Sequence, residues 1–172
     1  TTSHGWVGFN STYSQVTLLE PTDSLFVTLG FKYYTMLIEE FGTDHVYQSD
    51  TYNEMVPSTS NLTFLKMSNE AVYNAMASVD SDAVYLMQGW LFLNGFWTND
   101  RVEAYLSGVP NSHMMILDLY SEGHPLWSKF DNYYGKPWIW NMLHTFGGRR
   151  GLYGNISHVA SQPLIDLTSP NS

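Results

Sequence analysis

The feature that most constrains this chain is a series of short apolar runs that alternate with stretches of helical periodicity. The predicted strands are "HVYQSDT" at 45–51 and three more apolar segments, "AVYLMQGW" at 83–90, "MMILDLYSE" at 114–122 and "KPWIWNMLH" at 136–144. Strands that are apolar on both faces have to be covered on both faces, as in a parallel sheet flanked by helices. The pattern therefore predicts an α/β fold whose strands are parallel.

Helices are predicted where apolar residues recur every three or four positions. The first covers residues 24–40, begins at Asp23 or Ser24 and ends near Gly42. Its apolar face would consist of Phe26, Leu29, Tyr33, Met36 and Leu37.

A second helix is predicted over residues 68–79, with Ser68 as its N-cap. Its buried stripe would consist of Val72, Ala75, Met76 and Val79. A short third helix begins at Thr98 or Asn99. Helices and strands thus follow one another in a regular cycle.

Four strands are too few to close an eight-stranded barrel, so we expect residues 1–172 to be a fragment of a (β/α)8 TIM barrel catalytic domain. Residues 1–22 and 160–172 show no period and are predicted to be loop-like. The alternative, an open doubly wound sheet, fits the strand count but lacks a Gly-rich phosphate loop after a strand.

Composition excludes several classes of partner. Sixteen acidic and seven basic residues give a formal charge of −9, and the basic residues form no stripe, which argues against nucleic acid. No apolar run approaches the roughly 18 residues that a membrane span needs. The chain has no cysteine, which excludes disulfides and thiolate metal sites.

Three sequons begin at Asn10, Asn61 and Asn155. Chance alone would give about two such matches in a chain of this composition. The sequons are a weak indication of a glycosylated protein of the secretory pathway.

Polar and aromatic side chains follow each predicted strand, where a β/α barrel gathers its active-site groups. Glu54 lies among aromatic residues in "QSDTYNEM", with Asn53 before it and Tyr52 close by. A carboxyl group in a partly dry pocket can hold a proton near neutral pH and give it to a leaving oxygen, as glycoside hydrolysis requires. The alternative is that Glu54 only caps a loop or pairs with a surface arginine.

A second carboxylate is also needed for that chemistry, and within this chain the candidates at strand ends are Asp118 and Glu122. Either could instead hydrogen-bond to the start of a neighbouring helix. Four tryptophans could stack on a sugar ring or belong to the core: Trp90, Trp97, Trp138 and Trp140.

His144 ends the last predicted strand, where it could bind a hydroxyl group or an anion. The other histidines lack the spacing of metal ligands, so no metal and no cofactor are expected. No G-x-S-x-G motif is present either, which leaves no recognisable serine nucleophile.

Four ordered motifs give a specific resemblance. "FGTDHVYQSDTYNEM", "AVYLMQGWLF", "ILDLYSE" and "WIWNMLHTFGG" are similar in order and spacing to the catalytic domain of glycoside hydrolase family 89, and the likeness extends from "GFNSTYS" over nearly the whole chain. The resemblance implies a retaining exo-hydrolase with an (α/β)8 barrel, lysosomal in animals, that removes terminal alpha-linked N-acetylglucosamine from heparan sulfate.

The resemblance also implies roles for particular residues. It identifies Glu54 as the general acid/base and Asn53 and Trp90 as substrate-binding residues, with Trp140 and His144 bordering the same pocket. For Asp118 a substrate-binding role follows less directly. The family's nucleophile is a second glutamate on a later segment, which we do not find here, so this chain is expected to stop before it.

Two functions from different classes therefore remain. One is a glycosidase fragment, inactive alone, whose partner is a glycan with terminal alpha-N-acetylglucosamine; this leaves room for a homo-oligomer of the full-length enzyme. The other is a non-catalytic carbohydrate-binding module that keeps the aromatic pocket.

Overall fold

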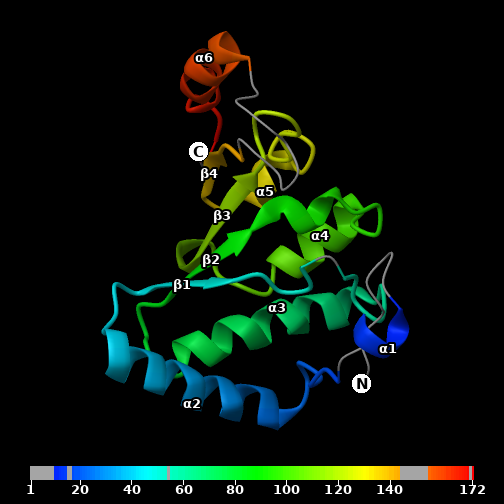
Figure 1. Ribbon diagram of the computed structural model, residues 1–172, viewed down its shortest axis with the longest axis vertical. Coiled ribbons are helices and arrows are strands. Elements are labelled where there is room, and N and C mark those ends of the chain that lie inside the picture. The colour runs from blue at the N-terminus through cyan, green and yellow to red at the C-terminus, as the bar shows by residue number, and fades with distance from the viewer. Residues whose placement is uncertain (1–9, 15–16, 54, 144–154, 171) are drawn as a thin grey trace.

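The computed structural model describes residues 10–14, 17–53, 55–143, 155–170 and 172. Four strands form one parallel sheet in the order β1-β2-β3-β4, with helices between them (Figure 1). The strands are β1 (Val46–Ser49), β2 (Val84–Gln88), β3 (Met114–Leu119) and β4 (Trp138–Asn141). The predicted parallel sheet is confirmed, and it corresponds to part of an α/β barrel.

The α-helices are α1 (Ser11–Ser14), α2 (Ser24–Phe41), α3 (Leu62–Ala77), α4 (Asn99–Leu106), α5 (Asp131–Tyr134) and α6 (Ile156–Asp166). Two 3-10 helices, η1 (Gly89–Leu93) and η2 (Asn111–His113), follow β2 and precede β3. No described helix is both long and apolar enough to cross a membrane.

The start of α2 is as predicted, because the Asp23 carboxylate accepts a hydrogen bond from the Leu25 N–H and caps the helix. Its buried face is only partly as predicted. Leu29, Tyr33 and Met36 are at least half exposed. The residues that pack against the core are Phe26, Tyr34, Leu37 and Ile38. The line of contact between α2 and α3 runs through Gly30. Glycine has no side chain and adds nothing to an apolar pattern, so the pattern did not reveal the buried face.

The predicted start of the second helix is wrong by six residues. α3 begins at Leu62, where the Asn61 side chain accepts a hydrogen bond from the Phe64 N–H. Ser68 is buried inside the helix and donates its hydroxyl to the Phe64 carbonyl at 2.9 Å. A serine can satisfy its hydroxyl in this way within a helix, so its presence does not mark an N-cap.

The predicted loop-like ends are also partly wrong. A single helical turn, α1, lies within residues 1–22, and α6 covers residues 160–166 of the segment predicted as loop. The Asn155 side chain caps α6 by accepting a hydrogen bond from the His158 N–H at 3.1 Å. Pro163 lies inside α6 and obscured its pattern, since proline normally ends a helix.

The two faces of the sheet differ, and this difference positions the site. Register pairs share a face, so Tyr85, Met87, Met114 and Ile116 lie on the face that packs against the helices. This core face carries the buried cluster that includes residues of α3 and α4. We call the opposite side the inner face, because it would face the inside of a closed barrel. Its residues in the strands are Val46, Gln48, Val84, Leu86, Gln88, Met115, Leu117, Leu119, Ile139 and Asn141.

Helix α3 is held closely on two sides. A Cβ atom added at Gly30 of α2 would collide with the Ala75 side chain. One added at Gly108, just after α4, would collide with the Lys66 carbonyl and approach the Glu70 nitrogen to 2.9 Å. The two glycines therefore allow α2 and the end of α4 to contact α3 at van der Waals distance.

Candidate functional site

The loop after β1 turns sharply just before Glu54. Tyr52 and Asn53 have φ values of 68° and 44°, in the left-handed region that non-glycine residues seldom occupy. Such conformations persist where the surroundings hold them, and they cluster at functional sites. Tyr52 and Asn53 therefore form a left-handed turn immediately before the predicted acid/base.

The Tyr52 side chain holds this turn against the core. Its hydroxyl donates to the Ser68 hydroxyl of α3 at 3.1 Å, and its ring lies 6.4 Å from that of Trp97 and 6.3 Å from that of Tyr105. The aromatic packing and the hydrogen bond offset the strained backbone. Asn53, the predicted substrate-binding residue, follows directly and is half-buried.

Glu54 and His144, predicted as the acid/base and as a pocket residue, lie outside the described residues. Glu54 is nevertheless bracketed by Asn53 and Met55, both of which are described. The Met55 N–H donates to the Tyr52 carbonyl at 2.6 Å, so the described residues on either side of position 54 are joined by a backbone hydrogen bond.

Trp90 differs from the other described tryptophans. Trp97 and Trp138 belong to the buried core, and Trp127 and Trp140 pack against it. Trp90 is half-buried, lies outside the core cluster and belongs to η1, immediately after the carboxyl end of β2. Its indole N–H donates to the Gln88 side-chain oxygen at 3.1 Å. A ring in this place can present a face to a ligand.

Asp50 lies beside this group, one position beyond the register pair Ser49 and Met87 that joins β1 to β2. Burial raises the pKa of Asp50, and the neighbouring Trp90 side chain opposes that rise in part. Its Oδ1 atom is buried and has no hydrogen-bond partner among the described residues. Keeping the Asp50 carboxyl group ionised in this place therefore costs free energy.

Asp118 has a different environment from the one that was predicted. Its side chain is completely buried on the core face and accepts hydrogen bonds from the Ser121 and Tyr133 hydroxyls and from the Leu126 N–H. Burial raises the pKa of Asp118, while these donors oppose the rise. The carboxylate thus ties β3 to the loop that follows it. Its role in substrate binding stays a prediction that these contacts do not favour.

Trp140 pairs in register with Asp118 and therefore shares the core face. Its indole nitrogen is buried and without a hydrogen-bond partner among the described residues. Glu122, the other candidate for the second carboxylate, accepts the Leu143 N–H at 3.0 Å. The structure thus brings Asn53 and Trp90 to the ends of two adjacent strands, whereas Asp118 and Trp140 are directed toward the core.

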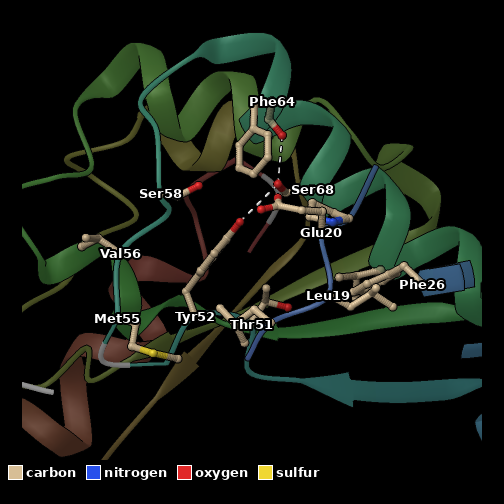
Figure 2. A pocket seen from close by; sticks show the side chains of 13 residues that line it. Leu19, Glu20, Phe26, Thr51, Tyr52, Met55, Val56, Ser58, Phe64 and Ser68 are labelled. Carbon is tan, nitrogen blue, oxygen red and sulfur yellow. Dashed lines mark hydrogen bonds between the residues drawn. The ribbon is translucent and has the colours of Figure 1, made fainter. Parts of the chain in front are cut away.

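A cavity of about 150 Å³ lies behind the loop after β1, on the helical side of the sheet (Figure 2). Its walls come from the segment before α2, from the loop itself and from α3, and they are mostly apolar. Tyr52, Met55 and Phe64 line it. The cavity lies behind the turn before Glu54. Trp90 is not among the residues that line it.

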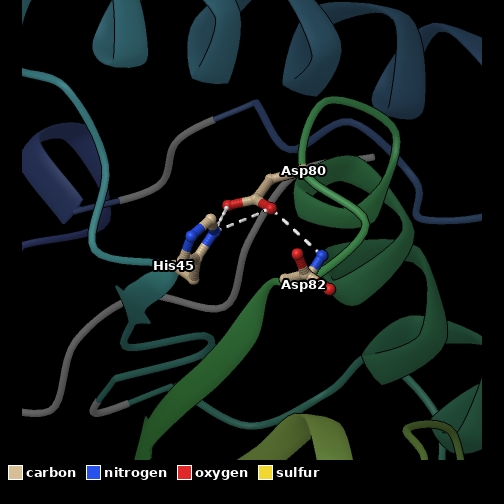
Figure 3. Close-up of side chains that lie close together, drawn as sticks. All are labelled: His45, Asp80 and Asp82. Carbon is tan, nitrogen blue, oxygen red and sulfur yellow. Dashed lines mark hydrogen bonds and ion pairs between the residues drawn. The ribbon is translucent and has the colours of Figure 1, made fainter.

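Three titratable side chains gather at the opposite ends of the strands (Figure 3). His45 precedes β1, and its Nδ1 atom lies 2.9 Å from an oxygen of buried Asp80. Ligand atoms of His45, Asp80 and exposed Asp82 lie within 4.8 Å of one another, so among the described residues these could approach one cation. Asp80 is already engaged by His45, by the Tyr47 hydroxyl and by the Asp82 N–H, which is the pattern of a structural pair.

This pair predicts a pH-dependent stability. The hydrogen bond to Asp80 raises the pKa of His45 above 6.5; burial acts to raise the pKa of Asp80, but hydrogen bonds from Tyr47 and His45 outweigh it and hold the value below 3.8. The His45 contribution is complete below its ordinary pKa and is lost as pH rises through the raised value. The Asp80 contribution is present above its ordinary pKa and is lost as pH falls.

We therefore expect His45→Gln to lower the thermal unfolding midpoint at pH 5.5 more than at pH 8.5. Scanning calorimetry at both values checks this, with exposed His124→Gln as the control. An equal loss at both pH values would show that the charge of His45 contributes nothing.

The three sequon asparagines share one geometry. Asn10, Asn61 and Asn155 are exposed, each directly precedes a helix, and each accepts a backbone N–H with its side-chain oxygen. Because a glycan would be attached through the side-chain nitrogen, capping and glycosylation are compatible. Their glycosylation remains a prediction.

Two residues of the site were not selected from the sequence, namely Gln88 and Asp50. They could have been found from the alternation of side chains along a strand, which places every second residue on the same face of the sheet. Gln88 falls on the same face as Val84 and Leu86 and is thus a polar residue at the end of the inner face. Asp118 falls on the same face as Met114 and Ile116, which parity would have assigned to the core.

Comparison with known proteins gives one family. The model of the alpha-N-acetylglucosaminidase (NAGLU) TIM-barrel domain matches residues 1–172. Human alpha-N-acetylglucosaminidase is 43% identical over 169 residues, which is 97% of this chain and 23% of the human protein. The chain therefore spans about a quarter of the length of that relative.

Solved structures agree in fold. A family 89 glycoside hydrolase from Clostridium perfringens in complex with PUGNAc has a TM-score of 0.75 at 28% identity, over 98% of this chain and 18% of that one. The same enzyme with 2-acetamido-1,2-dideoxynojirmycin gives 0.76 at 28% identity, over 99% and 18%. A variant with two glutamates changed to glutamine, in complex with its substrate GlcNAc-alpha-1,4-galactose, gives 0.76 at 27% identity, over 99% and 18%.

Proposed function

Because this chain belongs to the alpha-N-acetylglucosaminidase family of glycoside hydrolases, we propose that it supplies one part of the active site of an exo-acting glycosidase. The substrate would be a glycan that ends in alpha-linked N-acetylglucosamine. The observation that carries the proposal is the pairing of two features at adjacent strand ends. The left-handed turn before Glu54 follows β1, and Trp90, which is outside the core, follows β2.

In this proposal Trp90 stacks on the sugar ring while Asn53 hydrogen-bonds to the sugar. Glu54 protonates the oxygen of the leaving group as the glycosidic bond breaks. The same residue, then ionised, takes a proton from the water that attacks the anomeric carbon. The stereochemistry would be retaining, since a carboxylate on the other side of the sugar first forms a glycosyl-enzyme that the water then cleaves.

That second carboxylate would be a glutamate elsewhere in the whole protein. Asp118 is buried and accepts three internal hydrogen bonds, and Glu122 already accepts the Leu143 N–H, so both described candidates have internal partners. The two glutamates replaced in the bacterial substrate complex support a mechanism with two such residues. His144 would border the pocket, and Trp140 and Asp118, which lie on the core face, would shape it from behind.

The natural substrate would be heparan sulfate, and the enzyme a lysosomal or secretory glycoprotein. The identity to the human enzyme and the exposed positions of Asn10, Asn61 and Asn155 support this part of the proposal.

The test uses the whole protein that carries these 172 residues. We expect it to hydrolyse an aryl alpha-N-acetylglucosaminide and not the beta anomer. Proton NMR during the first turnovers should show the alpha anomer of the released sugar. Binding of N-acetylglucosamine without hydrolysis would instead indicate the carbohydrate-binding module.

A further inference from the structure

We propose that Gln88 is a positioning residue, whose side-chain oxygen fixes the indole of Trp90 in the orientation that receives the sugar. The inference rests on the proposed function, because it requires that the pocket beside Trp90 binds a sugar. Gln88 itself would touch no substrate atom and would act through Trp90.

The geometry begins with the ends of two strands. Gln88 is the last residue of β2, and Trp90 is two positions later, in η1. The indole N–H donates to the Gln88 oxygen at 3.1 Å, and both side chains are half-buried. This contact fixes one edge of the ring, because rotation of the indole by half a turn would exchange its N–H edge for a hydrocarbon edge that cannot donate.

Gly89 makes the turn between the two residues tight. An added Cβ would lie 2.9 Å from the Leu117 carbonyl oxygen and 3.1 Å from both the Ile116 side chain and the Tyr133 hydroxyl. The backbone at Gly89 therefore contacts β3 directly. With the backbone held there, the remaining freedom of Trp90 is in its side-chain torsions, and the hydrogen bond to Gln88 restricts these.

Asp50 lies near the same indole. It follows β1 at the position after the register pair Ser49 and Met87, beside Gln88 at the end of β2. Burial raises the pKa of Asp50, and the neighbouring Trp90 side chain opposes that rise in part. The indole N–H donates to Gln88 and the ring is not packed into the core, so this hydrogen bond rather than close packing has to orient it.

The experiment is a double-mutant cycle in the whole protein. Affinity for 2-acetamido-1,2-dideoxynojirmycin, which binds the bacterial family member, is measured by calorimetry. The variants are Gln88→Met, which keeps the length but removes the acceptor, Trp90→Phe, which keeps a ring but removes the N–H, and the double variant. Gln48→Met is the matched control, since Gln48 lies on the same face in β1 and has no hydrogen bond to Trp90.

We expect each single variant to weaken binding by about 2- to 10-fold, as the loss of one hydrogen bond implies. The double variant should bind about as weakly as Trp90→Phe alone, because the two changes remove the same contact. Gln48→Met should bind like the unchanged protein. A merely structural role for Gln88 would instead lower the unfolding midpoint and weaken binding equally in either background.

Unchanged binding by Gln88→Met, or losses that multiply in the double variant, would overturn the proposal. If Gln88→Met fails to fold, Trp90→Phe alone decides, since normal binding by that variant would show that the N–H is not needed. If the unchanged protein neither binds the inhibitor nor hydrolyses the aryl glycoside, the proposed function itself has failed.

Discussion

Replacing Glu54 by glutamine in the whole protein should reduce cleavage of GlcNAc-alpha-1,4-galactose by at least about 100-fold, and by up to about 10,000-fold for each proton transfer lost. The amide keeps the shape of the side chain but can neither protonate the leaving oxygen nor activate water. An aryl substrate whose leaving group departs without protonation should form the glycosyl-enzyme at a rate much less reduced. Steady-state and burst-phase kinetics on the two substrates measure this difference.

Azide separates the two carboxylate roles. It needs no deprotonation, so in Glu54→Gln it should attack the glycosyl-enzyme, restore turnover and give an azide with retained alpha configuration. In a variant of the nucleophile, azide would attack the substrate directly and give the beta product. A beta-azide from Glu54→Gln, or full activity on the disaccharide, would show that Glu54 is not the acid/base.

Asp118→Ala should produce the largest loss of stability among the described residues at the strand ends. The change leaves the Tyr133 and Ser121 hydroxyls and the Leu126 N–H without their shared acceptor in a completely buried place. Unsatisfied buried donors make the expected loss on the order of 3 kcal/mol in free energy of unfolding. Urea denaturation of the whole protein measures it.

Glu122→Ala is the matched control for that loss. Glu122 also follows β3 and also accepts a backbone N–H, but its side chain is only partly buried. Its removal should cost about 1 kcal/mol or less. If folded Asp118→Ala instead keeps its stability and shows a raised KM, Asp118 contacts the substrate after all.

The order of helices and parallel strands could be predicted because β2, β3 and β4 are short apolar runs and the helices between strands have a period of their own. The start of α3 could not, because Asn61 and Ser68 are both good capping residues and only packing selects between them. The buried face of α2 was misjudged for a related reason. Its contact line is centred on a glycine, so the apolar pattern was strongest one residue away from it.

For the site, the sequence identified the segments better than the side chains. The motif "QGW" indicated Trp90, which does lie outside the core. It did not indicate that Gln88, in the same motif, orients the ring. Asp118 and Trp140 follow strands just as Trp90 does, and only the parity of β3 and β4 shows that they point toward the helices. Position along a strand is visible in motifs, whereas the direction of a side chain depends on register.

The close packing of α3 against Gly30 and Gly108 affects how sequence variants of this protein should be interpreted. Gly30 and Gly108 fix α3 from two sides, and α3 carries Ser68, which holds the Tyr52 hydroxyl and with it the turn before Glu54. A bulkier residue at either glycine would displace the helix as a unit. If Glu54 acts as proposed, such a variant should lower activity although the substituted residue contacts no substrate, so distance from the active site would be a poor guide to its effect.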